Sequence, residues 1–329
     1  MEKVRVGWIG CGGFARYRMS RMLECLEAEI VALADPDPNQ IAATKARFPQ
    51  LADVPVYDDY RAMLAAGGLD AVSIASPHTL HAEQILGALE AGCHVICEKP
   101  LVTSVAQAKA VLAARDKAGK KGMVSYQRHL QPEFRYIKDK IASGEFGSVQ
   151  FVQALQCQEW KVATAGTWRQ VPELSGGGQL NDSGSHLLDI LLWVTDLKVD
   201  TVSAIIDHRG TPVDINSTLS IRFEGGALGS ISVVGDAQHW YEDITIWCEK
   251  GTFFMRNGKL SVSDAKGNRF GVEGLNIGTS HPDRNFLDGV LDRDWIQAPF
   301  ECGLRVIELT EAAWESGRQG GTPIKVVRG

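Results

Sequence analysis

The sequence contains no apolar run long enough to cross a lipid bilayer, which argues against a membrane-spanning protein. Its first residues show no signal-peptide pattern, so we expect a cytoplasmic protein. The seven cysteines are scattered and form no CxxC pair, which argues against a disulfide framework or a structural zinc site. A net charge of −6 leaves no excess of basic residues, so we expect neither nucleic acid nor a membrane surface as a partner.

The length of 329 residues exceeds what one hydrophobic core usually serves, so the sequence predicts two domains. The composition, 44% hydrophobic and 22% charged, is typical of a globular protein. Residues 1–124 alternate apolar strand patterns with helical patterns, which predicts an α/β domain with a doubly wound parallel sheet. Residues 125–329 contain longer strands that alternate polar and apolar residues, which predicts an α+β domain with a large, mostly antiparallel open sheet.

The first chemical signal is a glycine pattern between a strand and a helix, Gly10-Cys11-Gly12-Gly13-Phe14-Ala15. Gly10 permits a tight turn, Gly12 lets the backbone approach a pyrophosphate, and the small Ala15 lets the helix pack closely against the strand. Free N–H groups at the start of the helix favour phosphate binding. Asp35 ends the next strand, where a carboxylate accepts hydrogen bonds from an adenosine ribose. The pattern predicts a Rossmann dinucleotide site formed by Gly10, Gly12, Gly13, Phe14 and Asp35.

Asp35 also predicts which dinucleotide is preferred. Its carboxylate would lie against the 2′-phosphate of NADP, and like charges in a partly buried site repel. The residues that follow add Asp37 and no base, and we take Lys45 and Arg47, most of a helix away, as the nearest bases. We therefore expect NAD as the cofactor, with NADP a possible substitute.

The loop after a later strand supplies further candidate cofactor residues. Ser76 and Pro77 follow the strand pattern Ala71–Ala75, and His81 falls in the first turn of the next helix. Ligands of open parallel sheets bind beyond the carboxyl ends of the strands, so we expect this loop at the cofactor. His81 would either contact the nicotinamide ribose or cap backbone groups, and the sequence favours neither.

The apolar run Val95-Ile96-Cys97 predicts a buried strand that ends abruptly in Glu98-Lys99-Pro100. Pro100 lacks an N–H group and biases Lys99 away from helix, which favours one fixed turn. Taken alone, such a turn is either a solvated ion pair or a reactive site. Its position at the carboxyl end of a dinucleotide-binding sheet favours a reactive site that contains Glu98 and Lys99.

The strand patterns of the second domain also suggest an association surface. Residues 218–224 and 244–248 alternate apolar and polar side chains, so one face of the sheet should be covered by helices. We expect the other face to carry Ile221, Phe223 or Trp247 and to pack against another subunit, giving a homodimer or a homotetramer. A solvated, partly apolar face is the alternative.

A second chemical cluster lies in an apolar stretch that follows the glycine run Gly176–Gly178. Asp182, His186 and Asp189 are spaced i, i+4, i+7, which predicts one polar stripe on a buried helix over residues 182–193. Three interpretations compete: a satisfied core histidine, a general acid/base at His186 oriented by an aspartate, and a metal site. The predicted dinucleotide site favours acid/base chemistry, and we assign no metal ligand.

These motifs together resemble the Gfo/Idh/MocA family of NAD(P)-dependent oxidoreductases, named for glucose–fructose oxidoreductase and inositol dehydrogenase. The resemblance runs nearly end to end and rests on the glycine loop 10–15, the loop with Ser76, Pro77 and His81, the turn Glu98-Lys99-Pro100, and residues 178–193. It implies that Lys99 and His186 are the catalytic pair, that Asp182 is a third member, and that a cis peptide bond precedes Pro100. A helix over residues 301–317 also resembles the family's ending, and we expect it to pack back on the first domain.

The resemblance implies substrate-binding residues as well. Trp168 and Arg169 resemble positions that line the substrate pocket in some members, and Arg128 lies in another such stretch; with Asp182 and His186 they form the expected substrate site. An aromatic face and a guanidinium suit a polyhydroxylated ring, although a buried tryptophan and a solvated arginine are the alternative. Two positions depart from the family pattern, His78 in place of an asparagine and His129 in place of an arginine.

The expected activity follows from this resemblance. The chain should be an enzyme that transfers a hydride between a nicotinamide cofactor and a secondary alcohol or ketone of a sugar, a sugar derivative or an inositol-like cyclitol. His186 would take the hydroxyl proton, and Lys99 would stabilise charge on the reacting oxygen. The same chemistry could run a redox-neutral reaction, such as glycoside cleavage through a transient ketone. The alternatives from other classes are a non-catalytic dinucleotide-bound sensor and a metal-dependent lyase or isomerase that uses the 182–189 face.

Overall fold

The computed structural model describes residues 3–275 and 280–327, which form two compact units with one main β-sheet each. The first unit contains the chain up to Val102, then Ala106–Gln127 and Ser280–Gly303. The second contains Thr103–Val105, the described residues 128–275, and the chain from Leu304 onward. The division into functional domains at residue 124 and the packing of the 301–317 helix on the first domain stay predictions.

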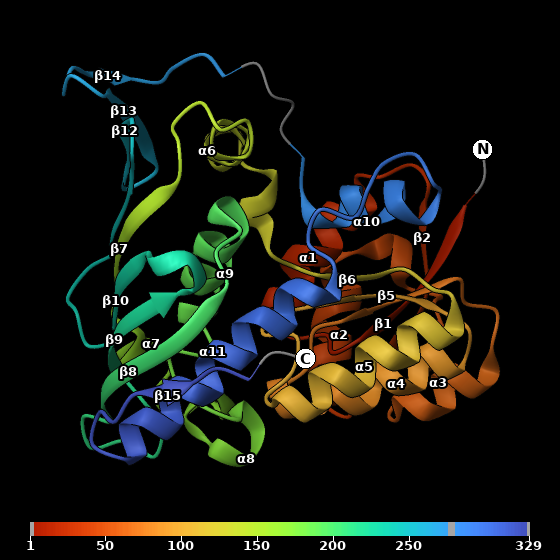
Figure 1. The fold of residues 1–329 in the computed structure, drawn as a ribbon. Helices are drawn as coiled ribbons and strands as arrows, with labels where there is room; N and C mark the ends of the chain where they lie inside the picture. The colour runs from red at the N-terminus through yellow and green to blue at the C-terminus, as the bar shows by residue number, and fades with distance from the viewer. Residues whose placement is uncertain (1–2, 276–279, 328–329) are drawn as a thin grey trace. The chain divides into compact units, whose positions relative to one another are not determined.

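The sheet of the first unit has six strands, and every neighbouring pair runs parallel (Figure 1). The strands are β1 (Val4–Ile9), β2 (Ala28–Ala34), β3 (Val56–Tyr57), β4 (Ala71–Ile74), β5 (His94–Cys97) and β6 (Gly122–Val124). Their order is β3-β2-β1-β4-β5-β6, so the direction of winding reverses between β1 and β4. Ligands of such sheets bind at this reversal, beyond the carboxyl ends of the strands. The predicted doubly wound Rossmann sheet is confirmed.

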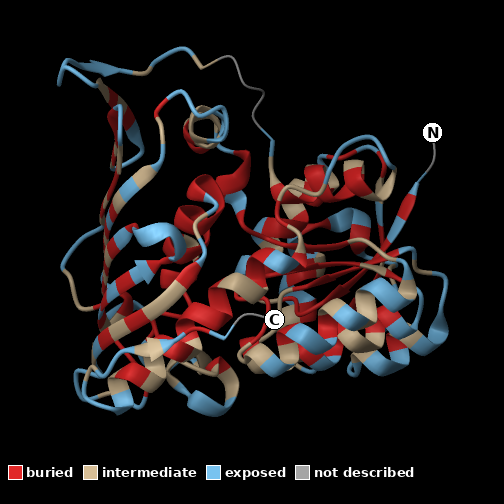
Figure 2. Cartoon of the chain, in the orientation of Figure 1, coloured by how far each residue is buried: buried red, intermediate tan, exposed pale blue. Residues whose placement is uncertain are grey.

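Helices connect these strands, as the alternating patterns predicted. They are α1 (Gly13–Leu23), α2 (Pro38–Arg47), α3 (Tyr60–Ala66), α4 (His81–Glu90) and α5 (Val105–Ala118), with short 3₁₀ turns η1 (Pro49–Leu51) and η2 (His78–Leu80). Asp37 and Asp59 begin α2 and α3 by accepting hydrogen bonds from the backbone N–H groups two residues later. Figure 2 shows the strands buried and the outer faces of these helices exposed, as expected for a sheet covered on both sides.

A segment far along the chain completes the first unit. The helix α10 (Pro282–Val290) packs on α1, and Ala298 accepts a hydrogen bond from Val124 N at the edge strand β6 (N···O 2.8 Å). A side chain at Gly122 would collide with the ring of Phe300, at 2.7 Å. Because these partners lie more than 150 residues apart in sequence, local patterns did not predict this packing.

The sheet of the second unit has nine strands and is largely antiparallel, as predicted. The strands are β7 (Val149–Cys157), β8 (Val199–Asp207), β9 (Asn216–Phe223), β10 (Leu228–Val234), β11 (Tyr241–Cys248), β12 (Gly251–Arg256), β13 (Lys259–Asp264), β14 (Arg269–Gly271) and β15 (Ile324–Lys325). Their order is β14-β13-β12-β11-β7-β10-β9-β8-β15, and β10 runs parallel to β7. β7 therefore lies at the centre of the sheet.

Helices pack on one face of this sheet. They include α6 (Pro132–Ala142), α7 (Trp160–Ala163), α8 (Pro172–Ser175), α9 (Gly184–Thr195) and, from Leu304 onward, α11 (Phe300–Arg318), with 3₁₀ turns η3 (Gln127–Leu130), η4 (Trp168–Gln170) and η5 (Glu224–Gly226). α9 contacts β7 and α6 contacts α9. Among the described residues, no helix is both long and apolar enough to cross a membrane.

The predicted placement of Ile221 and Phe223 on the face of this sheet away from the helices was wrong, whereas Trp247 does lie on that face. Ile221 and Phe223 are each only 3% exposed, because they point to the face that the helices cover. Trp247 pairs with Phe151 across β11 and β7, and this pair lies on the opposite face with ring centroids 5.7 Å apart. Strand alternation separates two sets of side chains, but it does not tell which set faces the helices.

Candidate active site

The glycine loop between β1 and α1 has the geometry that a pyrophosphate requires. Gly10 has φ +83°, and a Cβ there would lie 2.7 Å from the backbone carbonyl of Ala75, so only glycine fits. Gly12 is the N-cap of α1, and a Cβ there would meet no atom within 4 Å. The first turn of α1 contains no acidic residue. The open side of Gly12 and the free N–H groups of α1 therefore fit a bound phosphate.

The neighbours of the loop also occupy the expected places. Gly13 begins α1, and an added Cβ there would have Arg16 as its nearest contact, at 3.9 Å. Ala15 is buried against the sheet, whereas Phe14 is 52% exposed. The residues present thus fit a dinucleotide along the loop, with the Phe14 ring at its outer side.

Asp35 is held at the edge of this loop by backbone groups. Its Oδ2 accepts a hydrogen bond from Cys11 N at 2.7 Å, and its Oδ1 accepts one from Asp37 N at 2.9 Å. The carboxylate thereby links the end of β2 to the glycine loop. This placement suits a hydrogen bond to the adenosine ribose.

The structure corrects which base lies near Asp35. Arg16 Nη1 donates to Cys11 O at 2.7 Å and to Gln40 Oε1 at 3.0 Å, so its guanidinium lies at the glycine loop. Lys45 instead donates to the carbonyls of Ala52 and Val54. Arg16 stands on the same helical face as Gly12, four residues later, and that spacing could have identified it.

His81 joins two of the predicted loops. It is fully buried, with Nδ1 2.8 Å from Pro100 O and Nε2 3.0 Å from Ser76 O. Burial lowers the pKa of His81, although its backbone carbonyl partners oppose the shift. Both ring nitrogens therefore face backbone groups, which matches the capping alternative; contact between His81 and the cofactor stays a prediction.

The rest of the Ser76–Pro77 loop is also held in place. Ser76 Oγ donates to Gln84 Oε1 at 2.5 Å, which ties the loop to α4. His78, the departure from the family pattern, is 4% exposed and packs near His81 with ring centroids 5.8 Å apart. The structure thus gives His78 a packing role.

Glu98 does not point into an open site. Its carboxylate accepts a hydrogen bond from Arg18 Nη1, and the same nitrogen donates to Ser125 Oγ at 2.7 Å. The opposite side of the guanidinium binds Asp283 on α10, with Arg18 Nη2 2.6 Å from Asp283 Oδ1. All three charged side chains are buried. Sequence reasoning missed Arg18 and Asp283, and it placed Glu98 at the cofactor, which stays untested beside this structural role.

Lys99 is the candidate catalytic residue that follows the end of β5. The Lys99–Pro100 peptide bond is cis, as the resemblance implied. Lys99 is half-buried, and the preceding residue is tied to the sheet through Glu98 N and Ile74 O at 2.9 Å. The amine therefore follows directly from a fixed strand end, where ligands of this sheet bind.

In the second unit, the polar stripe predicted over residues 182–189 is not continuous. α9 begins at Gly184, so Asp182 lies in the turn before the helix. His186 lies in the first turn and is half-buried, with its amide 3.2 Å from Ser183 O.

Asp182 gathers the residues predicted to bind substrate. It is 3% exposed, and its Oδ2 accepts from Trp160 Nε1 at 2.9 Å and from Arg169 Nε at 3.1 Å. The Arg169 guanidinium lies over the Trp168 ring, 4.5 Å from its centroid. Trp160, which the sequence did not single out, thus fixes the carboxylate from its buried side.

Asp189 has a different partner. Its Oδ2 lies 2.7 Å from His129 Nε2, and the His129 ring stacks on Trp193 with centroids 4.2 Å apart. Both members of the pair are buried, and they hold α9 to η3. Asp182 and Asp189 thus bind different side chains, and these contacts do not test the metal site considered for this face.

Comparison with known proteins decides the family. Residues 4–126 match the family model described as an oxidoreductase family with an NAD-binding Rossmann fold, and residues 134–254 match the GFO/IDH/MocA C-terminal domain. This chain belongs to the Gfo/Idh/MocA family. The predicted resemblance is confirmed.

Several curated relatives are dehydrogenases. D-glucoside 3-dehydrogenase of Escherichia coli (strain K12) is 32% identical over 192 residues, which cover 58% of this chain but only 54% of that protein. Levoglucosan dehydrogenase of Pseudarthrobacter phenanthrenivorans is 26% identical over 327 residues, covering 86% of this chain and 82% of the relative. An uncharacterized oxidoreductase, ORF334 of Rhizobium meliloti, is 31% identical over 236 residues, which cover 71% of this chain and 69% of that protein.

Solved structures share the whole fold. Levoglucosan dehydrogenase in complex with NADH and levoglucosan has a TM-score of 0.88 and 22% identity, covering 99% of this chain and 100% of that one. The WlbA dehydrogenase from Bordetella pertussis, in complex with NADH and UDP-GlcNAcA, has a TM-score of 0.85 and 26% identity, with complete coverage of both chains. This likeness supports the two-unit fold of the Gfo/Idh/MocA family across the chain.

Two neighbouring residues of this Gfo/Idh/MocA member, Arg128 and His129, have buried partners. His129, which stands where the family pattern has an arginine, pairs with Asp189. Arg128 is 8% exposed, and its Nη2 donates to Glu242 Oε2 at 2.6 Å. The Arg128 guanidinium thus binds a side chain of β11. This contact does not test whether Arg128 also binds substrate.

Proposed function

We propose that this chain is an NAD-dependent oxidoreductase that acts on a secondary alcohol, or the matching ketone, of a sugar, a sugar derivative or a cyclitol. The observation that carries the proposal is the pairing, in one sheet, of a glycine loop open at Gly12 with a lysine at the carboxyl end of β5. The named relatives support a sugar substrate, since they include a glucoside and a levoglucosan dehydrogenase.

Bound NAD would supply the hydride acceptor at its nicotinamide ring. Backbone groups at Gly10, Gly12 and Gly13 would hold its pyrophosphate, and Asp35 its adenosine ribose. The Ser76–Pro77 loop, at the end of β4, would lie near the nicotinamide half.

His186 and Lys99 would handle the substrate's hydroxyl group. His186 accepts the hydroxyl proton while a hydride leaves the same carbon, so a ketone remains and the imidazole is protonated. Lys99 donates a hydrogen bond to the reacting oxygen and stabilises its developing negative charge. In the reverse direction, the imidazolium returns its proton to the alkoxide.

Asp182 would position the substrate next to His186. Its carboxylate is held by Trp160 and Arg169, so it presents a fixed acceptor for a sugar hydroxyl. Trp168 and Arg169 add a flat face and a donor, which suits the apolar and polar sides of a polyhydroxylated ring.

A substrate screen tests the proposal. Sugars, sugar acids, glycosides and inositols are incubated with NAD, and nicotinamide absorbance is followed in the parent protein and in Lys99→Ala. We expect reduction of NAD with at least one polyol, in the parent only. Tight NAD binding without turnover on any of them would instead support the sensor. Product analysis covers the redox-neutral alternative, in which substrate is consumed without accumulation of NADH.

We also propose that the chain forms a homodimer or homotetramer through the sheet face that carries Phe151, Trp247 and Phe254. These side chains come from β7, β11 and β12 and share the face opposite Ile221. Light scattering at micromolar concentration should report at least a dimer, and a monomer would contradict the proposal. The seven cysteines of this chain are scattered, which supports a reducing cytoplasmic location.

A further inference from the structure

One residue outside the predicted motifs, Asp214, holds the chain immediately before the candidate site. It lies between β8 and β9 and is 4% exposed. Its Oδ1 accepts from Gly178 N at 2.9 Å, and its Oδ2 accepts from Leu180 N at 2.8 Å. Its backbone carbonyl accepts from Gln179 N at 2.9 Å. A single residue thus binds three successive backbone N–H groups.

The glycine run explains how this contact is possible. A Cβ at Gly178 would lie 1.9 Å from the Asp214 carbonyl oxygen, and a Cβ at Gly177 would lie 2.4 Å from the Trp314 ring. The backbone can approach Asp214 and Trp314 only because both positions lack side chains. The glycine run is therefore tightly packed at Gly177 and Gly178.

Two of these three residues, Gly178 and Gln179, also accept hydrogen bonds from the segment that carries the candidate catalytic residues. Gly178 O accepts from Asp182 N at 3.0 Å, and Gln179 O accepts from Gly184 N, the first residue of α9, at 2.8 Å. His186 follows in the first turn of that helix. A chain of hydrogen bonds thus leads from Asp214, through residues 178–180, to Asp182 and to the start of α9.

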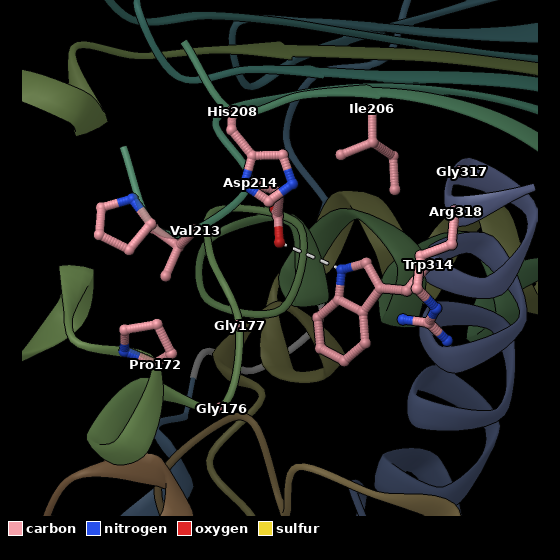
Figure 3. Close-up of a pocket in the computed structure, with 11 residues that line it drawn as sticks. Pro172, Gly176, Gly177, Ile206, His208, Val213, Asp214, Trp314, Gly317 and Arg318 are labelled. Carbon is pink, nitrogen blue, oxygen red and sulfur yellow. Dashed lines mark hydrogen bonds between the residues drawn. The ribbon is translucent and has the colours of Figure 1, made fainter. Parts of the chain in front are cut away.

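Trp314 fixes the carboxylate of Asp214 from a third direction. Its Nε1 donates to Asp214 Oδ1 at 3.1 Å, as Figure 3 shows. Both side chains line a cavity of about 550 Å³, which His208 and Arg318 also border. Burial raises the pKa of Asp214, but the three N–H donors favour its ionised form.

We propose that Asp214 is a positioning residue, which sets the placement of Asp182 and His186 by binding Gly178 and Leu180. The proposal rests on the function proposed above, because it assumes that Asp182 and His186 act on substrate. Asp214 would act on them through the loop at residues 178–180. Misplacement of a reacting group by about 1 Å can cost about 100-fold in rate, so a loop held by one residue can control kcat.

The test compares Asp214→Asn with Ser316→Ala. The amide cannot accept a hydrogen bond through its NH₂ group, so one of the two loop contacts is lost. Ser316 is a matched control in the same unit: it is fully buried, accepts from Ala204 N at 2.8 Å and donates to Thr322 O at 2.7 Å. It makes no contact with residues 178–186 in these hydrogen bonds. Trp314→Phe is a milder variant, since it removes only the indole hydrogen bond.

We expect kcat to fall about 10- to 100-fold in Asp214→Asn, less in Trp314→Phe, and little in Ser316→Ala, with NAD affinity unchanged in all three. The pH dependence of kcat/KM should also shift in Asp214→Asn alone, since the surroundings of His186 change. Equal losses of kcat in Asp214→Asn and Ser316→Ala, at equal loss of stability, would show a merely structural role and overturn the proposal. If Asp214→Asn does not fold, Trp314→Phe decides by the same comparison.

Hydrogen exchange separates this proposal from the proposed function. Amides of Gly178, Leu180 and Asp182 should exchange faster in Asp214→Asn than in the parent, and Ser316→Ala should leave them protected. This result holds whether or not a substrate is found, so absence of turnover in the parent refutes the function only. Unchanged protection of these amides in Asp214→Asn would refute the positioning role.

Discussion

Replacing Arg18 by methionine should destabilise the first unit strongly. Arg18 carries one positive charge between Glu98 and Asp283, and all three side chains are buried. Methionine has a similar apolar length but no charge, so the variant would leave two buried carboxylates without their partner. Removing one member of a buried ion pair typically costs about 3–5 kcal/mol.

The comparison variant is Asp283→Asn. It leaves Arg18 with one carboxylate, so the cluster becomes neutral, and the loss is that of charge-assisted hydrogen bonds, about 1.5–3 kcal/mol. Arg18→Met should therefore cost more. The double variant should be more stable than Arg18→Met alone, because it contains one unpaired carboxylate in place of two.

Hydrogen exchange of peptides from β1, α1 and β5 measures the effect in the first unit only. A loss of about 3–5 kcal/mol makes the slowest amides exchange roughly 10²- to 10⁴-fold faster. If Arg18→Met cost no more than Asp283→Asn, or if the double variant were the least stable of the three, the charge argument would be wrong.

The pH dependence gives a second check with a definite sign. In the parent, burial opposes ionisation of Asp283, but Arg18 and then His281 hold its pKa below the ordinary value. Without Arg18, the burial that opposes ionisation of Asp283 would raise the pKa of this carboxyl in the folded state. Protonation then favours the folded state, so the stability deficit of Arg18→Met should be smaller at about pH 5 than at about pH 8.

Three further predictions concern the site and the fold. Lys99→Ala and His186→Ala should each lower kcat about 10²- to 10⁴-fold while the Kd for NAD stays unchanged; near-parental turnover of either would remove that residue from the mechanism. Asp35→Ser should narrow the ratio of kcat/KM for NAD over NADP by roughly tenfold, and a parental preference for NADP would contradict the argument. Hydrogen bonds from Arg284 lower the pKa of Glu27 to about 2. Because the folded pKa is depressed, stability should decline as the pH falls from about 4.3 towards 2. Denaturation of Glu27→Gln should lack that decline.

Local patterns in the sequence determined much of what surrounds the cofactor site. The strand at residues 4–9, the glycine loop and Asp35 lie within one βαβ segment, so their spacing alone predicts how they meet. The apolar strand that ends in Glu98-Lys99-Pro100 likewise predicted the placement of Lys99, since parallel strands present their carboxyl ends at one edge.

Patterns could not decide contacts between distant segments. Arg18 donates hydrogen bonds to Asp283, which lies 265 residues away in sequence, and Trp160 donates one to Asp182, which lies 22 residues away. Glu98 is adjacent to Lys99 in sequence, yet it faces Arg18 because the helix α1 brings a buried guanidinium there. Sequence spacing describes neighbours on one helix or strand and says nothing about the side chain that the next layer supplies.

The second sheet shows the same division. Alternation along β9 correctly separated Leu219, Ile221 and Phe223 from the polar residues between them. Whether that apolar set faces helices or another surface is decided by which side α9 packs on, and only the tertiary structure contains that choice. The same holds for Asp214, whose proposed role depends on the approach of the segment between β8 and β9 to the glycine run. A local sequence pattern shows which residues of a strand lie on the same face. Which element covers that face is decided by the packing of the whole unit.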